Sequence, residues 1–98
     1  MQALTIRTIT DCLSPVFKNH HVHRAILFGS VAKGTAHSRS DLDLYVESEL
    51  KGLRFLGLLE DVCSAINMDV DLLDASHVEK GSLVHKEILS TGVVIYEE

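Results

Sequence analysis

The chain has 98 residues, of which 46% are hydrophobic and 23% are charged, and its formal net charge is −5. This composition is typical of a globular protein, and the length suits one compact core, so we expect a single domain over residues 1–98. The negative charge leaves no broad basic face for a phosphate backbone, which argues against direct nucleic-acid binding.

Membrane and export signals are missing from the sequence pattern. No apolar run approaches the roughly 20 residues of a membrane span, and the N-terminus lacks the layout of a signal peptide. We therefore expect a cytoplasmic protein. Cys12 and Cys63 lie among apolar neighbours in segments of helical periodicity, and we interpret both as free thiols in the core.

The first half of the chain predicts one helix and two strands. Apolar residues recur at spacings of three and four over residues 3–17, as on a helix with one buried face, and Pro15 should end or kink this helix near its last turn. The apolar run 24–28 closes at Gly29, which indicates a buried strand followed by a loop rich in Gly, Ser and Thr. Residues 41–46 alternate polar with apolar, the period of a half-buried strand.

The second half continues the alternation of helix and strand. Residues 51–66 carry a helical apolar stripe, and residues 68–73 return to the period of a strand. Ser82 is a suitable N-cap for a last helix through Leu89, and Gly92 stops that helix before a closing strand over 93–96. The order helix, strand, strand, helix, strand, helix, strand places the chain in the α/β (α+β) class.

Two aspartates stand together on the second predicted strand. Residues two apart on a strand point to one face, so Asp41 and Asp43 project side by side while Leu42 and Leu44 enter the core. Like charges this close repel and raise each other's pKa, so the pair is best explained by a divalent cation that neutralises it. Mg²⁺ is the expected ion, because it prefers hard oxygen ligands and shares them with a triphosphate.

A third carboxylate is expected on the next strand. Asp71 is the first candidate because it lies deeper in the apolar run 70–73, with Asp69 on the same face as the alternative and Asp74 as a further competitor. In a two-metal site this carboxylate would take the proton of an acceptor hydroxyl while the hydroxyl oxygen attacks the α-phosphorus and pyrophosphate leaves.

The loop after the first strand suits the phosphates of the substrate. Gly29 permits close backbone approach, and Ser30 adds a hydroxyl beside N–H groups at the start of a short helix. Lys33 and Arg39 can supply positive charge to a triphosphate such as ATP, although both equally suit a solvated surface. The segment is not a Walker A loop, because no Gly-Lys-Ser or Gly-Lys-Thr follows.

In order and spacing, these motifs resemble the signature of minimal nucleotidyltransferases in the DNA polymerase β superfamily. The matching segments are Gly29-Ser30-Val31-Ala32-Lys33-Gly34, Ser40-Asp41-Leu42-Asp43-Leu44, Val70-Asp71-Leu72 and the ending 93–96. The resemblance implies the polymerase-beta-like fold, a small mixed β-sheet of about four strands flanked by helices. It also implies that Gly29 and Ser30 hold the nucleotide phosphates, that Asp41 and Asp43 bind Mg²⁺, and that Asp71 is the third acidic residue.

The resemblance also implies a partner. Larger members of the family carry an acceptor-binding domain for which this chain has no room, and stand-alone domains of this size are commonly paired with a helical HEPN protein. In such toxin–antitoxin pairs the nucleotidyltransferase neutralises a HEPN ribonuclease by AMPylating its tyrosine. We therefore expect an adenylyltransferase that works with a second chain, as a homo- or hetero-oligomer. Lys33 departs from the arginine usual at its position, which keeps the charge but loses the bidentate fork.

Two other functions stay open from the sequence. A non-catalytic antitoxin could block its partner by occupancy, which the small size, acidic surface and Lys33 favour, and a transferase could act on a small molecule with a pocket from a second subunit. Histidines at 20, 21 and 23 lack the further ligands of a metal site. His37 suits an exposed loop position, and Tyr45 shares the face of the acidic pair, where packing is the simpler role.

Overall fold

The computed structural model describes residues 5–33 and 41–98, without the side chains of Ser30 and Lys33. Its elements follow the predicted order, with the short helix expected after the first strand present as α2 and with a 3-10 helix η1 added. They are α1 (Ile6–Asn19), β1 (Arg24–Phe28), α2 (Gly29–Lys33), β2 (Leu42–Glu47), α3 (Leu53–Ile66), β3 (Val70–Asp74), η1 (Ala75–His77), α4 (Leu83–Thr91) and β4 (Val93–Glu97).

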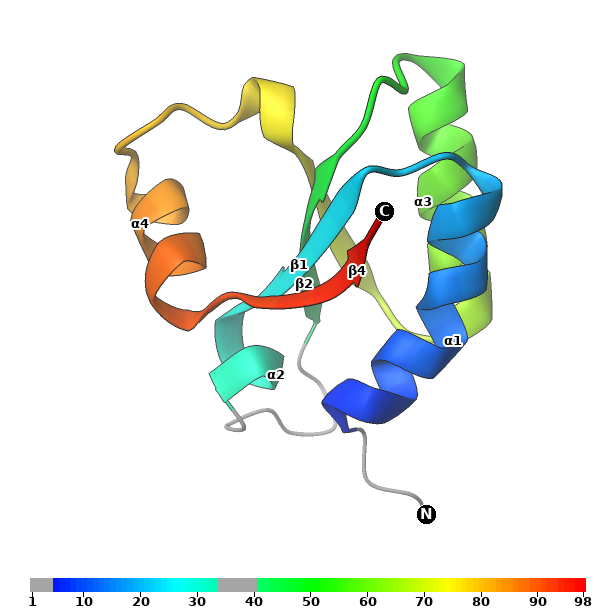
Figure 1. Ribbon diagram of the computed structural model, residues 1–98, viewed down its shortest axis with the longest axis horizontal. Helices are drawn as coiled ribbons and strands as arrows, with labels where there is room; N and C mark the ends of the chain where they lie inside the picture. Colours follow the sequence, from blue (N-terminus) through cyan, green and yellow to red (C-terminus); the bar gives the residue numbers. More distant parts are fainter. Residues whose placement is uncertain (1–4, 34–40) are drawn as a thin grey trace.

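The four strands form one mixed sheet, as predicted. The strand order is β3-β2-β1-β4, so β3 and β4 are its edges. β2 pairs with β3 in parallel, and β1 pairs antiparallel with both β2 and β4. Figure 1 shows α1 and α3 together on one side of the sheet and α4 with α2 on the other. One face of the sheet is therefore covered by a helical layer, and the other is covered only in part.

The main core lies between the sheet and the pair α1 and α3. Every fourth residue of α1 faces this core, and alternate residues of β1 and β2 meet it from the sheet, as the helical and strand periods require. The fully buried members are Ile9, Leu13, Phe17, Val22, Ala25, Leu27, Leu42, Leu44, Val46, Leu58 and Val62. Burial of a large aliphatic or aromatic side chain stabilises a fold by about 1.5–3 kcal/mol, so this layer supplies most of the apolar stabilisation.

Helix α1 differs from expectation at two positions. It continues for a turn past Pro15 to Asn19, because Phe17, beyond the proline, is fully buried on the same stripe as Leu13. Cys12 is exposed, so its assignment to the core is wrong. The buried stripe of α1 repeats every four residues, and Cys12 falls just outside it. Cys63 is partly buried.

Helix α4 begins as the sequence indicated. The hydroxyl of Ser82 accepts a hydrogen bond from the His85 backbone N–H at 3.2 Å, which is the geometry of an N-cap. Ile88 of α4 and Phe28 of β1 are only 5% and 6% exposed, in line with contact between α4 and β1. Within the described residues, no helix has the length and apolar character needed to cross a membrane. The single-domain organisation stays a prediction.

Candidate functional site

Strand β2 separates an apolar face from a polar one. Leu42, Leu44 and Val46 are fully buried, whereas Asp43 and Tyr45 between them are only partly buried and face away from the main core. Asp41 directly precedes the strand and is exposed. The alternation predicted from the sequence is confirmed, and it places the Asp43 side chain on the partly covered face of the sheet.

Strand β3 brings a second aspartate beside Asp43. In the parallel pairing of β2 with β3, Asp43 stands opposite Asp71, while Leu42 stands opposite Val70. Asp69 precedes β3, and its backbone carbonyl accepts a hydrogen bond from the Leu42 N–H at 3.0 Å. Register therefore places Asp71 across from Asp43 and leaves Asp69 one step outside the strand.

Gly29 lets the Asp43 carboxylate approach the end of β1. Its φ is +77°, in the left-handed region that favours glycine. A Cβ added there would come within 3.1 Å of the Asp43 carboxyl carbon and would overlap its Oδ2. The register explains this closeness, because Phe28, the residue before Gly29, pairs with Asp43. A glycine is therefore needed at this position for two reasons, the backbone angle and the neighbouring carboxylate.

The carboxylates influence one another. Partial burial raises the pKa of Asp43 above its ordinary value, and the negative charges of Asp71, Asp41 and Glu87 raise it further. Glu87 comes from α4, and sequence reasoning missed it. No local pattern marks this residue, because its approach to Asp43 depends on how α4 packs over β1 and α2. The site is therefore a shared acidic volume with contributions from three elements.

This repulsion predicts that Asp43→Asn stabilises the protein without metal. A raised folded-state pKa contributes stability that is present below the unfolded pKa of about 3.9 and is lost as pH rises through the folded pKa. Ionised Asp43 is therefore unfavourable at neutral pH, and solvent limits the effect to about 0.5 kcal/mol. We expect thermal denaturation at pH 7.5 in EDTA to show a Tm about 2–4 °C higher than wild type.

The control for this prediction is Glu60→Gln, which removes one negative charge from an exposed position of α3. It should leave Tm almost unchanged, and the Asp43→Asn gain should shrink as pH falls toward 4. An unchanged or lower Tm for Asp43→Asn at pH 7.5 would show that the carboxylates do not repel in the folded state.

The structure describes the other predicted site residues to different extents. Ser30 and Lys33 belong to α2, but their side chains lie outside the described part of the structure. Arg39 and His37 lie outside the described residues altogether. Tyr45 is partly buried on the Asp43 face, and burial together with the charge of Glu47 raises the pKa of its phenol. The phenol therefore stays protonated at neutral pH.

The histidine-rich connection after α1 makes pairwise contacts. His20 Nε2 lies 2.6 Å from Asp61 Oδ2 on α3, which ties the end of α1 to that helix. His23 lies 3.9 Å from Glu49 and 3.7 Å from Glu98. That these histidines are not metal ligands stays a prediction.

The side chains around Asp43 can be compared with the ligands that Mg²⁺ prefers. Among the residues that the structure describes, no three His, Cys, Asp or Glu side chains are placed to hold a metal ion by themselves. Mg²⁺ usually takes one or two carboxylates and fills its other positions with water and substrate phosphates. The hard oxygens of Asp41, Asp43 and Asp71 fit that mode of binding, in which the triphosphate completes the ligand set.

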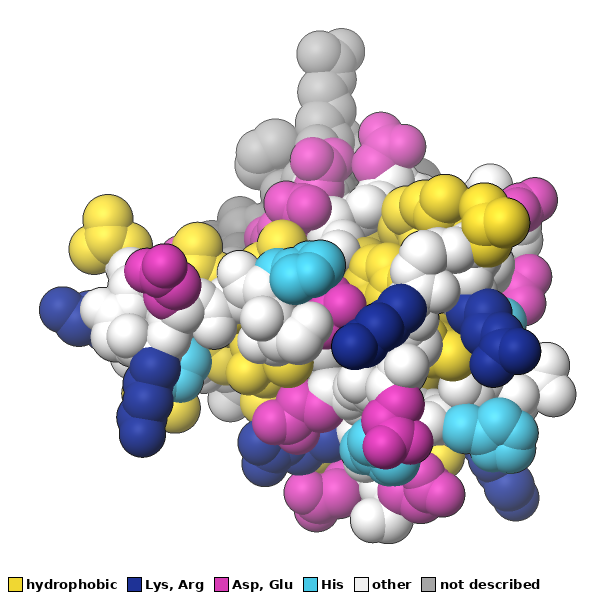
Figure 2. Space-filling view, turned by 90° about the horizontal axis from the view of Figure 1, so that it is seen from above, with side chains coloured by type: hydrophobic (Ala, Val, Ile, Leu, Met, Phe, Trp, Pro, Cys, Tyr) yellow, Lys and Arg dark blue, Asp and Glu magenta, His cyan; other side chains and the backbone are white. Residues whose placement is uncertain are grey.

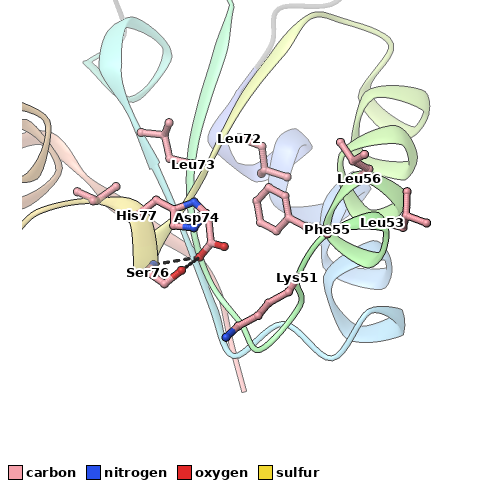
Figure 3. A pocket seen from close by; sticks show the side chains of 11 residues that line it. Lys51, Leu53, Phe55, Leu56, Leu72, Leu73, Asp74, Ser76 and His77 are labelled. Atoms are coloured by element: carbon pink, nitrogen blue, oxygen red, sulfur yellow. Dashed lines mark hydrogen bonds between the residues drawn. The ribbon is translucent and has the colours of Figure 1, made fainter.

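A pocket in the described part lies elsewhere. Its volume is about 770 Å³, and it is found at the other end of β3, between that strand and the start of α3, as Figure 3 shows. Its lining is mainly apolar and does not include Asp41, Asp43 or Asp71. Charged substrates need polar groups and not an apolar cavity, so the acidic face is the better candidate for phosphate chemistry.

Comparisons with known proteins concern the family and the fold of the chain. The family model described as polymerase beta, nucleotidyltransferase matches residues 12–98. This match includes β1, Gly29 and all three aspartates. No curated protein sequence matches the chain significantly.

Solved structures share the fold at low sequence identity. A chain of a toxin–antitoxin crystal structure with AMP-PNP matches with TM-score 0.77 at 22% identity, over 91% of this chain and 73% of that one. A complex of a tri-AMPylated HEPN toxin with an MNT antitoxin from Shewanella oneidensis gives 0.72 at 17%, over 96% and 74%. A minimal nucleotidyltransferase gives 0.75 at 22%, over 95% and 98%. The predicted fold is confirmed.

Proposed function

This chain belongs to the polymerase beta nucleotidyltransferase family, and from that premise we propose that it transfers AMP from ATP to a tyrosine hydroxyl of a HEPN-type partner. Nucleotidyl transfer is the activity of the family. The observation that carries the assignment of the site is the pairing of Asp43 with Asp71 beside the open backbone of Gly29. It joins an acidic, metal-compatible face to a turn that a phosphate can approach closely.

Each residue of the site has a proposed role. Asp41 and Asp43, with Asp71, would hold Mg²⁺, which when bound neutralises the triphosphate and orients it. Gly29 and Ser30 receive phosphate oxygens at the turn after β1, with Lys33 and Arg39 as sources of positive charge. Asp71 is exposed, so its carboxylate is accessible to an acceptor.

The transfer step then follows from this placement. Asp71 accepts the proton of the acceptor hydroxyl, and the hydroxyl oxygen forms a bond to the α-phosphorus. The bond from the α-phosphorus to the oxygen that bridges to the β-phosphate breaks, and pyrophosphate leaves with that electron pair. The adenylyl group remains on the acceptor as a phosphodiester.

The proposed partner is supported by the related structures and by the shape of this chain. One neighbour is a toxin–antitoxin with AMP-PNP, and another contains a tri-AMPylated HEPN toxin with its MNT antitoxin. Asp71 is exposed on the side of the sheet where Figure 1 shows α4 and α2, so a second protein can bring its hydroxyl to this carboxylate.

The direct test uses α-labelled ATP, Mg²⁺ and a purified HEPN protein as the candidate acceptor. We expect label in the HEPN protein with wild type and none with the double variant Asp41→Ala/Asp43→Ala, since both carboxylates of the pair are then lost. Label retained by the double variant would refute the proposed site. Absence of label with wild type, together with neutralisation of the HEPN protein by both chains, would instead establish a module that acts by occupancy.

A further inference from the structure

The pocket at the far end of β3 has the form of a docking surface. Its walls come from the first turn of α3, from the end of β3 and from the segment after η1, and their apolar members are Leu53, Phe55, Leu56, Leu72, Leu73 and Val78. Figure 3 shows Phe55 and Leu72 close together between helix and strand. β3 is an edge strand, so among the described residues no strand pairs with its outer edge.

Two leucines at this pocket are exposed to solvent. Leu53 is 84% exposed and Leu56 is 56% exposed, although both lie on a helix whose other face joins the main core. Exposed aliphatic side chains beside an apolar hollow mark interaction sites more often than isolated exposed ones. The arrangement offers both projecting side chains and a hollow to an incoming partner.

Two cations stand at the start of α3: Lys51 lines the pocket, as does Asp74 of β3, and Arg54 belongs to the first turn of the helix. Lys51 and Arg54 are exposed and form no ion pair with any other described residue. Helix α3 has no acidic residue in its first turn, and its N-cap Gly52 has no side chain with which to cap it. A helix N-terminus carries partial positive charge and favours carboxylates, so Arg54 there is unfavourable for the isolated helix.

This local conflict points to an acidic partner group. A carboxylate placed near Lys51 and Arg54 would pair with both cations at the positive end of the helix, where the Arg54 and Phe55 N–H groups already donate to backbone carbonyls. Figure 2 views this end of the molecule and shows hydrophobic side chains beside basic ones. Local rules are commonly broken at functional sites, where the compensation comes from a ligand.

We infer that the pocket binds an aliphatic segment of the acceptor protein that carries a carboxylate beside its apolar side chains. The identity of that protein rests on the proposed function. Asp71 and Asp74 at the pocket are three residues apart on β3, which is about 10 Å along the strand. Residues three apart on a strand point to opposite faces, so a protein that occupies the pocket has to reach around the edge strand β3 to present a hydroxyl at Asp71.

A docking site that is separate from the catalytic carboxylates is expected to affect KM and not kcat. Binding energy that is equal in the substrate complex and the transition state lowers KM and leaves kcat unchanged. Pocket variants should therefore raise KM for the acceptor protein about tenfold or more, with kcat at saturation close to wild type. The acidic-site variants should show the reverse, with transfer lost and binding retained.

The test compares Leu53→Glu with Leu83→Glu in titration calorimetry and in label transfer, with the HEPN protein as the probe. Leu83 is a matched control, since it is 85% exposed and lies on α4. Arg54→Glu is compared with Lys86→Glu, also an exposed residue of α4. Because all four positions are exposed, none of these changes should affect folding. We expect at least a tenfold rise in Kd and KM for Leu53→Glu and Arg54→Glu alone.

The outcomes separate this inference from the proposed function. Wild-type Kd and KM in both pocket variants, or an equal loss in the α4 controls, would overturn the docking site while leaving the transferase intact. Binding that depends on Leu53 without any transfer of label would support the docking site and refute the transferase. A wild-type chain that fails to bind the HEPN protein would overturn both.

Discussion

Replacing Asp71 by Asn is expected to lower the proposed AMP transfer by about 10²–10⁴-fold, the usual contribution of a proton acceptor in the transition state. The amide keeps the size of the side chain but can neither take a proton at neutral pH nor neutralise a cation. Asp71 is exposed and stands opposite Asp43 in the sheet, so its removal relieves a repulsion and should not lower Tm. Loss of transfer with an unchanged or slightly higher Tm is the expected result.

Asp69→Asn is the matched comparison. Asp69 lies just before β3, and its described contact is made by its backbone carbonyl, which the substitution preserves. We expect transfer within a few-fold of wild type, measured with the same labelled ATP and partner. The reverse pattern, in which Asp69→Asn is inactive and Asp71→Asn is active, would make Asp69 the third carboxylate and show that the β2–β3 register does not place the proton acceptor.

Gly29→Ala is expected to impair both stability and transfer. A residue with a side chain in the left-handed region costs about 1–2 kcal/mol, which lowers Tm by about 4–16 °C in a domain of this size. The new Cβ would also displace the Asp43 carboxylate from the turn. Because a shift of about 1 Å in a catalytic group can reduce a rate by about 10²-fold, we expect the loss of transfer to exceed the loss expected from unfolding.

Gly57→Ala provides the control for Gly29→Ala. Gly57 lies within α3, and an added Cβ there would have no neighbouring atom within 4 Å. Alanine is the better helix former by about 0.5–1 kcal/mol, so this variant should be as stable as wild type or more so, and fully active. Circular dichroism at the assay temperature identifies the folded fraction. Wild-type transfer by folded Gly29→Ala would show that the closeness of Gly29 and Asp43 has no role in the reaction.

Part of the fold and of the site can be predicted from the pattern within single segments, and the rest depends on packing between segments. Periodicity within one segment sufficed for the order of helices and strands, for the Ser82 cap, and for placing Asp43 on the face opposite Leu42 and Leu44. The reason is that strand and helix periods depend on neighbours in the chain, and these are visible in the sequence. The motif of Gly29 with Asp41 and Asp43 could be recognised in the sequence for the same reason.

Contacts between segments could not be read in this way. The choice of Asp71 over Asp69 as the residue opposite Asp43 depends on the β2–β3 register, and the approach of Glu87 depends on how α4 packs. The exposure of Cys12 and Leu53 depends likewise on which side of each helix meets the sheet.

The sequence by itself determined the element order, the polar face of β2 and the chemistry of its acidic residues. Only the tertiary structure decided which carboxylates share a volume, why Gly29 must lack a side chain, and where an apolar pocket stays open beside Lys51 and Arg54. The physical reason is that register and helix orientation follow from burial summed over the whole core, and no single segment encodes that sum.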